Sequence, residues 1–446
     1  MLIAVLLTTI LLALRFGTPA AILVLATVDR LGLDFGMMWK PFYFFWPILV
    51  FECINEYQTK GPPALLRSAS SRWALLFLVA CLLWVGISVW STGGEPASVN
   101  YMGVVLMLSG FTLTFGFRLG FGDSMRRLLD SLPWVGILVG AWGLVVFGLF
   151  ILDPSKTPMA DGRETGIFLD PRFLVPRLCG LAGDPNAWMM QILPLWAVNW
   201  LPTTSRSAAW PRWIALILLG LNLFMVGSRT GWVLAALVPA VALLTRAARR
   251  SRVHLAAISM GLVFLAIIGV ATQFGLMDTD LGQHSQARAN FGESRLELWA
   301  GSLDVAMDNP ILGIGPGMIA TSEEMRLASG LGVGLQTHNA WLELMVEAGI
   351  PAFLFMAMAM AALVLHSLRF IRFWDSETLP LLSVTLAFVA ILLAETSISY
   401  ITSPTLWVWF FVLLLLQAEQ TGRWEANTET MIPDPDDPDE FDLVSG

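Results

Sequence analysis

Charged residues are scarce in this chain of 446 residues. They make up 13% of the sequence, whereas a soluble domain carries roughly 25%. Hydrophobic residues make up 56%, and the mean hydropathy is +0.69. This composition excludes an ordinary soluble domain and predicts a polytopic membrane protein.

Cysteines and metal-binding motifs are also sparse. Cys53, Cys81 and Cys179 are too few and too scattered for a disulfide framework or a metal cluster. The motifs HExxH and CxxC do not occur, nor do paired carboxylates at metal-ligand spacing. The sequence therefore offers no support for metal catalysis, and we expect no cofactor.

Basic residues are absent from residues 425–446, which hold eight acids. These acids account for the whole formal net charge of −8, since the rest of the chain has 26 acids and 26 bases. The run IPDPDDPDEF cannot bury a core. We therefore expect one integral membrane domain over residues 1–420 and a disordered acidic cytoplasmic tail over residues 421–446. We expect no nucleic acid as a partner.

Long apolar runs, in contrast, are abundant. A spanning helix needs about 20 largely apolar residues. The run at 2–28 contains Arg15 and Pro19, so it is either one broken helix or a short helical pair. In all, the sequence predicts an all-α protein of about 12 transmembrane helices, centred on residues 2–28, 38–56, 73–91, 100–118, 132–152, 185–201, 212–227, 230–246, 254–275, 339–367, 379–396 and 401–418.

Lysine and arginine indicate the orientation of these helices, because cytoplasmic loops retain them. They gather in alternate connections, for example at Lys60, at Arg126 and at Arg249. A cytoplasmic N-terminus requires an odd number of crossings before residue 29, which favours one span over the first run. The connections expected on the outer side are 92–99, 153–184, 276–338 and 397–400.

The outer connection at 276–338 is the longest polar interruption of the chain. It carries eight acids and three bases. Its GIGPG stretch at 313–317 lacks the preceding strand and the Lys-Ser/Thr pair of a phosphate loop. We therefore interpret GIGPG as a tight turn.

A short helix is predicted within this outer loop. Ser294 and Glu297 form a capping-box pattern, and Trp299 and Leu303 recur at helical spacing. The helix is expected to end near Asn309 and to lie at the membrane surface, with Trp299 at the headgroup level.

His338 is the first candidate for chemistry. It lies in the triplet Thr337-His338-Asn339, at the start of a predicted membrane helix on the outer side. An imidazole titrates near neutral pH, which suits a general base. The alternative is a helix-capping side chain that takes no part in catalysis.

Three arginines on the outer side are candidate phosphate ligands. Arg229 lies in GSRTGW between two apolar runs, where a charge is costly and indicates function; its guanidinium can bind phosphate by paired hydrogen bonds. Arg295 opens the predicted short helix, whose positive end favours anions. Arg177 precedes GLAGDPN. The alternatives are a snorkelling anchor for Arg229 and a solvated loop charge for Arg295.

Several of these motifs together resemble those of a known family, the O-antigen ligase and O-antigen polymerase superfamily. They are GSRTGW at 227–232, SRLELW at 294–299 with DNPILGIGPG at 308–317, and THNAWLELMVEAGIP at 337–351. GLAGDPNAW at 180–188 also resembles a helix start of that family. The resemblance covers residues 180–400, and order, spacing and topology agree.

This resemblance implies a GT-C-like glycosyltransferase of the bacterial inner membrane, with its active site facing the periplasm. Such enzymes transfer a glycan en bloc from undecaprenyl pyrophosphate to an acceptor hydroxyl, with inversion and without a metal. Arg229 and Arg295 would then bind the pyrophosphate and His338 would act as the base, while Arg177 is a weaker pyrophosphate ligand. The implied partners are the undecaprenyl-pyrophosphate-linked glycan donor, a glycan or lipid A-core acceptor, the lipid bilayer and proteins of polysaccharide assembly.

Other functions remain open at this stage. A polymerase, an O-antigen ligase and a protein O-oligosaccharyltransferase share these motifs. The sequence shows no large extra outer domain, which makes the last of these the least favoured. A polysaccharide transporter or flippase would distribute charge through its spans or contain an internal repeat, whereas the charge here gathers at one face. A non-catalytic scaffold for an assembly complex is a further class.

Overall fold

The structure is a computed structural model of the whole chain. The residues that it describes are 2–27, 45–63, 66, 69–92, 96–121, 124–152, 169–170, 175–176, 178, 185–200, 209–226, 231–232, 234–236, 239–240, 298–319, 322–328, 337, 339–369, 381, 384–385, 388–389 and 408–416. The predicted acidic tail at 421–446 lies outside these residues.

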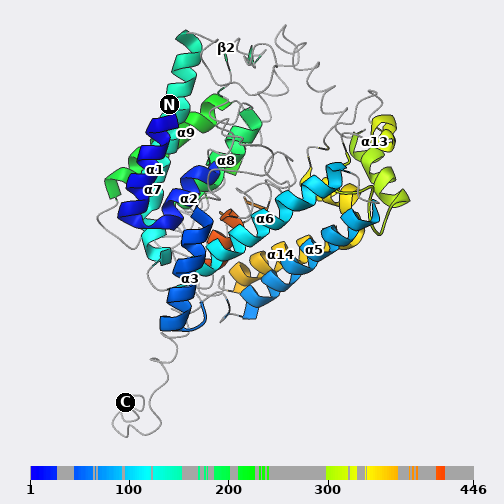
Figure 1. Cartoon of the computed structure of the whole chain (residues 1–446). Coiled ribbons are helices and arrows are strands. Elements are labelled where there is room, and N and C mark those ends of the chain that lie inside the picture. Colours follow the sequence, from blue (N-terminus) through cyan, green and yellow to red (C-terminus); the bar gives the residue numbers. More distant parts are fainter. Residues whose placement is uncertain are drawn as a thin grey trace, which may run out of the picture.

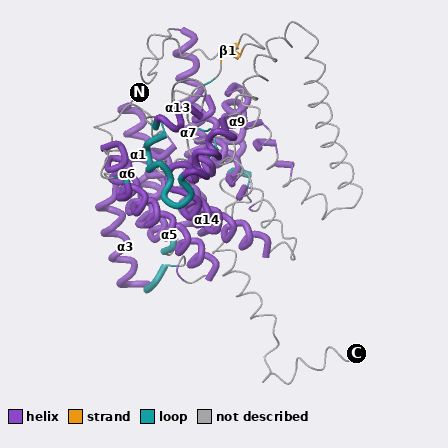
Figure 2. The backbone as a smooth tube through the Cα atoms, turned by 90° about the vertical axis from the view of Figure 1, so that its right-hand side faces the viewer, coloured by secondary structure: helices purple, strands orange, loops and turns teal. Residues whose placement is uncertain are grey.

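Helices make up nearly all of the described chain (Figures 1 and 2). They are α1 (Leu2–Phe16), α2 (Thr18–Thr27), α3 (Trp46–Lys60), α5 (Ala69–Ser91), α6 (Pro96–Leu119), α7 (Ser124–Leu152), α8 (Pro185–Val198), α9 (Ala209–Val226), α13 (Glu323–Ala328) and α14 (Ala340–Arg369), with helical residues also at 298–308 and 408–416. One antiparallel ladder joins β1 (Leu169–Asp170) to β2 (Val175–Pro176), with Leu169 opposite Pro176. The all-α prediction is confirmed for this part apart from the ladder.

Five of the described helices are long and apolar enough to cross a membrane: α5, α6, α7, α9 and α14. Large apolar side chains cover their outer surfaces; Trp90 and Phe224, for example, are 85% and 70% exposed. A soluble protein does not leave such surfaces to water, so the chain is a multi-pass membrane protein. The total of about 12 spans and the GT-C-like architecture stay predictions, because several runs lie outside the described residues.

The first apolar run forms two consecutive helices, and the expectation that it crosses the membrane once stays a prediction. α1 and α2 meet at Gly17, which has a φ of 93°. The Thr18 hydroxyl donates to Glu52 Oε1 over 2.9 Å, and Glu52 also accepts a hydrogen bond from Arg118 at the end of α6. The turn therefore lies at the end of the molecule where α6 finishes. Both helices pack against α7 and against each other (Figure 1).

A row of glycines brings α7 close to α9, which packs beside it (Figure 1). A Cβ added at Gly136 would lie 2.9 Å from the Ala215 Cβ, and a Cβ at Gly140 would lie 2.8 Å from the Leu218 Cβ. These distances are too short for side chains, so glycine permits the approach. Small residues at such interfaces are typical of helix pairs in membranes.

Asn222 fills the next position of this interface. Its Nδ2 donates to the carbonyl oxygens of Gly140 and Leu218 over 2.9 and 2.8 Å, and its Oδ1 accepts from Trp188 Nε1 over 3.1 Å. A Cβ at Gly143 would lie only 2.0 Å from that Oδ1. The amide is thus fully buried and bonded at both ends, and it ties α7, α8 and α9 together.

The second group of helices is formed by α5, α6 and α14. α5 and α14 run side by side over much of their length, and α13 lies near one end of the pair (Figure 1). That end carries the described part of the predicted outer loop. A small hydrophobic core connects this loop to α14. It is made of Val305, Ala306, Ile319, Met325 and Val346.

Candidate functional site

The four residues predicted to carry the chemistry, His338, Arg229, Arg295 and Arg177, lie outside the described residues. The structure describes their neighbours in the chain, which show what surrounds these positions.

Two hydrogen-bonded residues flank position 338. Asn339 caps α14, because its Oδ1 accepts the N–H groups of Trp341 and Leu342 over 3.1 and 3.2 Å. The fully buried Thr337 accepts the Asn339 N–H over 3.2 Å and donates its hydroxyl to the Asn339 carbonyl over 2.8 Å. The backbone on either side of position 338 is therefore fixed at the start of α14.

The helix predicted in the outer loop is confirmed over residues 298–308, and it ends where expected, before Asn309. Trp299 Nε1 donates to the Thr337 carbonyl over 2.7 Å, so the chain four residues after Arg295 meets the residue before His338. The Leu303 side chain of this helix is 45% exposed. The buried face is formed by Leu298, Ser302, Val305 and Ala306.

A second contact joins the neighbourhoods of two predicted arginines. The Leu178 N–H, directly after Arg177, donates to the Met225 carbonyl over 3.1 Å. Met225 is the penultimate residue of α9, four positions before Arg229. Thus the structure brings together the chain near 177 and 229, and separately the chain near 295 and 338.

α14 is interrupted at Gly349, where φ is 80° and ψ is 174°. In an unbroken helix the Val346 carbonyl would accept the Ile350 N–H. Here Ile350 donates to the Pro310 carbonyl over 2.8 Å, and Val346 accepts from the Ile314 N–H over 2.9 Å. The outer loop therefore replaces the missing turn of helix.

The Glu347 and Ala348 carbonyls are also satisfied from outside the helix. Glu347 O accepts the Gly315 N–H over 3.0 Å and the Ser88 hydroxyl over 3.2 Å. Ala348 O accepts from Trp84 Nε1 over 3.2 Å, and the same N–H reaches the Ile311 carbonyl over 3.1 Å. Irregular backbone at membrane depth requires such partners, and α5 supplies them.

GIGPG is a chain of tight turns, as predicted, and it packs against the interruption of α14. Gly313, Gly315 and Gly317 all have positive φ. A Cβ at Gly313 would lie 2.4 Å from the Glu347 carbonyl, and a Cβ at Gly349 would lie 2.2 Å from the Ile311 carbonyl oxygen. Glycine is thus required on both sides of the contact.

Two acidic residues at this junction were not predicted as functional. Glu343 and Glu347 are each 3% exposed and lie one turn apart on α14. Glu347 Oε1 accepts the Gly317 N–H over 3.0 Å, and Glu343 Oε2 accepts from the Thr337 hydroxyl at 3.3 Å. The sequence contained a signal for both residues, because carboxylates four residues apart inside an apolar run are costly and indicate a function.

Comparison with known families finds a match in this part of the chain. Residues 214–357 match the family model described as O-Antigen ligase, and the match includes GSRTGW, SRLELW, GIGPG and the start of α14. This segment is therefore similar to O-antigen ligases. The resemblance to the ligase and polymerase superfamily is thereby confirmed. No curated protein matches the chain in sequence.

This match indicates the general activity of the chain. The similarity, together with the apolar helices, points to a multi-pass membrane protein with an activity of the O-antigen ligase type. Within the matched residues, the loop at 309–319 and the start of α14 form one hydrogen-bonded unit.

Proposed function

We propose that the chain is an inner-membrane, inverting glycosyltransferase that transfers a glycan en bloc from undecaprenyl pyrophosphate to an acceptor sugar hydroxyl at the periplasmic face. It would act as an O-antigen or exopolysaccharide polymerase or as an O-antigen ligase. The observation that carries this proposal is the similarity of residues 214–357 to O-antigen ligases.

In this reaction the acceptor hydroxyl oxygen attacks the anomeric carbon of the donor glycan. The bond between that carbon and the pyrophosphate oxygen breaks, and the hydroxyl proton passes to His338. The leaving group is undecaprenyl pyrophosphate, which needs fixed positive charge where its negative charge develops. We assign that role to Arg229 and Arg295, with Arg177 as a further ligand, so the step requires no metal.

The fixed backbone at the start of α14 supports the role of His338. A general base must lie within hydrogen-bond reach of the acceptor hydroxyl, and a small displacement of a catalytic group can cost about 100-fold in rate. Thr337 and Asn339 are both anchored by hydrogen bonds. The anchored neighbours therefore support the assignment of the base to this point of the chain.

Replacement of His338 tests the proposal. We expect His338→Ala to abolish glycan transfer to acceptor in proteoliposomes while the thermal unfolding temperature stays unchanged. His284→Ala is the matched control, because it removes the other histidine of the same loop. Full activity of His338→Ala would exclude it as the base.

Replacement of Arg229 by lysine tests the pyrophosphate site. Lysine keeps the charge but loses the paired hydrogen bonds of the guanidinium, so we expect weaker donor binding. Unchanged donor KM in Arg229→Lys would contradict this assignment.

Deletion of the gene separates the two activities. A lost polymerase leaves core with a single repeat unit, whereas a lost ligase leaves long polymer on the lipid carrier. Gel analysis of surface polysaccharide distinguishes these outcomes, and an unchanged pattern would contradict both.

A further inference from the structure

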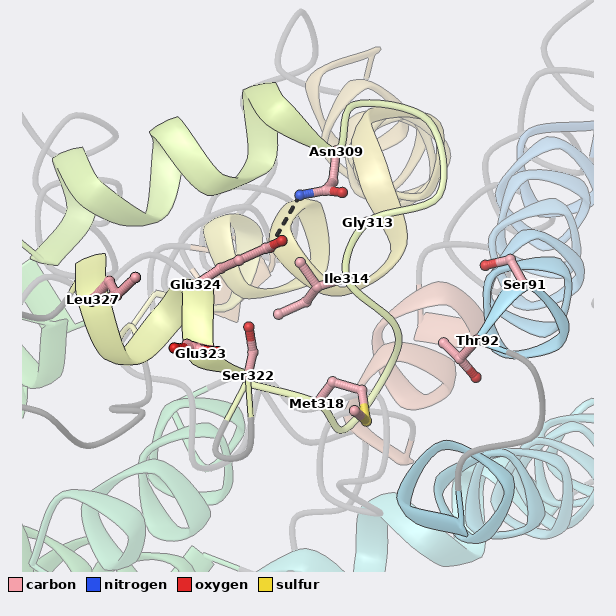
Figure 3. A pocket seen from close by; sticks show the side chains of 10 residues that line it. All are labelled: Ser91, Thr92, Asn309, Gly313, Ile314, Met318, Ser322, Glu323, Glu324 and Leu327. Atoms are coloured by element: carbon pink, nitrogen blue, oxygen red, sulfur yellow. Dashed lines mark hydrogen bonds between the residues drawn. The ribbon is translucent and has the colours of Figure 1, made fainter.

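A cavity of about 590 Å³ opens beside the α14 junction, between the end of α5, the loop after Asn309 and α13 (Figure 3). Its volume is within the roughly 300–1,000 Å³ typical of small-molecule sites. In Figure 3, α13 carries Glu323, Glu324 and Leu327 on one side, while Ser91 at the end of α5 and Thr92 after it lie across the opening.

The polar part of the lining consists of hydroxyl, amide and carboxylate groups. Asn309 Nδ2 donates to Glu324 Oε2 over 3.2 Å and to the Val305 carbonyl over 3.2 Å, which fixes the amide and the carboxylate relative to each other. No lysine or arginine is among the described residues that line the cavity. The two carboxylates of this described lining repel a pyrophosphate, so the cavity does not suit the anionic end of the donor.

The remaining lining is aliphatic. Ile314, Met318 and Leu327 face the same space as the Asn309 and Glu324 pair (Figure 3). A sugar ring has hydroxyl edges that donate to carboxylate and amide oxygens, and C–H faces that contact aliphatic side chains. A site with both kinds of surface, and with excess negative charge, suits a sugar that bears no acid group.

The cavity is also built on the backbone that holds the start of α14. Ile314, which lines it, is bonded to the Val346 carbonyl, and the next turn is bonded to Glu347. Glu347 is eight residues beyond Asn339 in α14, a rise of about 12 Å along a helix. A glycan of a few sugars can span that distance to the start of α14.

We propose that this cavity is a subsite for a non-acidic sugar of the acceptor glycan, held by Glu324 and Asn309 a few sugars away from the attacking hydroxyl. This inference rests on the proposed transferase function, since it names the acceptor's binding place. The acceptor has two possible sources, a lipopolysaccharide core or a second repeat unit, which share this sugar chemistry.

Transfer kinetics in proteoliposomes test the subsite. We expect Glu324→Ala to raise the acceptor KM about tenfold, the effect of losing hydrogen bonds to a carboxylate, with donor KM unchanged. Asp304→Ala is the matched control, because Asp304 is an exposed carboxylate of the neighbouring helix and does not line the cavity. Equal acceptor KM values for wild type and Glu324→Ala would overturn the subsite.

A binding measurement keeps the subsite testable without catalysis. Leu327 is 75% exposed, so Leu327→Cys in the full chain should react with a membrane-impermeant maleimide. We expect lipid-free core oligosaccharide or lipid-free repeat-unit oligosaccharide to slow this reaction several-fold, and the effective one identifies the source. Asp304→Cys should not be protected by either.

The outcomes separate the two proposals. Protection of Leu327→Cys in a protein that transfers no glycan overturns the transferase function and leaves sugar binding. Transfer by the wild type with no protection by either oligosaccharide overturns the subsite and leaves the transferase function.

Discussion

The interface of α7 with α9 and the interface of α5 with α14 differ in how their buried polar groups find hydrogen-bond partners. In the first, regular helices approach through glycine, and the buried amide of Asn222 is bonded at both ends. In the second, α14 is interrupted, and α5 and the outer loop bond the carbonyls that the interruption frees. We expect the first interface to contribute mainly to stability, whereas the second also holds irregular backbone beside the start of α14. Variants that affect one interface and spare the other test this division.

Gly349→Ala should have the largest effect. The added Cβ would lie 2.2 Å from the Ile311 carbonyl oxygen at a positive φ, so the loop and α14 must separate. We expect a loss of at least about 3 kcal/mol in stability and loss of glycan transfer, measured by thermal unfolding and by transfer in proteoliposomes.

Gly61→Ala is the control for this variant. Gly61 also has a positive φ, 74°, but a Cβ there meets nothing within 4 Å. It should cost only about 1–2 kcal/mol of backbone strain and leave transfer intact. Equal effects of the two substitutions would show that conformation, and not close contact, requires glycine at 349.

Gly143→Ala should break the other interface. The new Cβ would lie 2.0 Å from Asn222 Oδ1 and displace the amide, for a loss of about 1–3 kcal/mol. Gly148→Ala on the same helix meets nothing within 4 Å and should be neutral. If the interface of α7 with α9 contributes mainly to stability, Gly143→Ala lowers the unfolding temperature, while the folded fraction transfers glycan at the normal rate. A selective loss of transfer would contradict it.

Thr337→Val should affect transfer more than stability. The variant keeps the shape of the side chain but removes the hydroxyl that binds Asn339, so we expect kcat to fall about tenfold, equivalent to about 1.4 kcal/mol. Thr112→Val is matched, since Thr112 is equally buried and its hydroxyl binds Leu108 within its own helix. Similar kcat values for both variants would remove Thr337 from the site.

Trp84→Phe should have the smallest effect. It removes one N–H that two carbonyls share, Ile311 O and Ala348 O, at a cost of about 1 kcal/mol. Trp90→Phe on the same helix changes a side chain that is 85% exposed and should not alter the unfolding temperature. Stability equal to wild type in Trp84→Phe would show that other groups bond these carbonyls.

The sequence predicted the long helices well, because apolar length is a local property. The run at 73–91 became Ala69–Ser91, and the run at 339–367 became Ala340–Arg369. The short helix before Asn309 was likewise indicated by its capping pattern and by the proline that follows. The O-antigen ligase resemblance also came from local motifs in a fixed order.

Features that depend on distant partners were not predictable. The interruption at Gly349 is stabilised by Ser88 and Trp84, which are more than two hundred residues away in sequence. The exposure of Leu303 and the hairpin of α1 and α2 likewise depend on neighbouring elements that periodicity does not reveal. The cavity beside α13 combines three segments that are distant in sequence, and no motif indicates that they meet. The roles of His338 and the three arginines stay predictions.

The interruption of α14 also sets how this enzyme can tolerate changes in length. Each residue added to a helix rotates everything beyond it by about 100° and shifts it by about 1.5 Å. Between Asn339 and Gly349 both ends are fixed, one by Thr337 and Trp299 and the other by the loop. An insertion there cannot be accommodated without moving one of these ends, whereas an insertion after Pro351 leaves the start of α14 in place. The number of residues between Asn339 and Gly349 should therefore be constant even where the side chains between them vary.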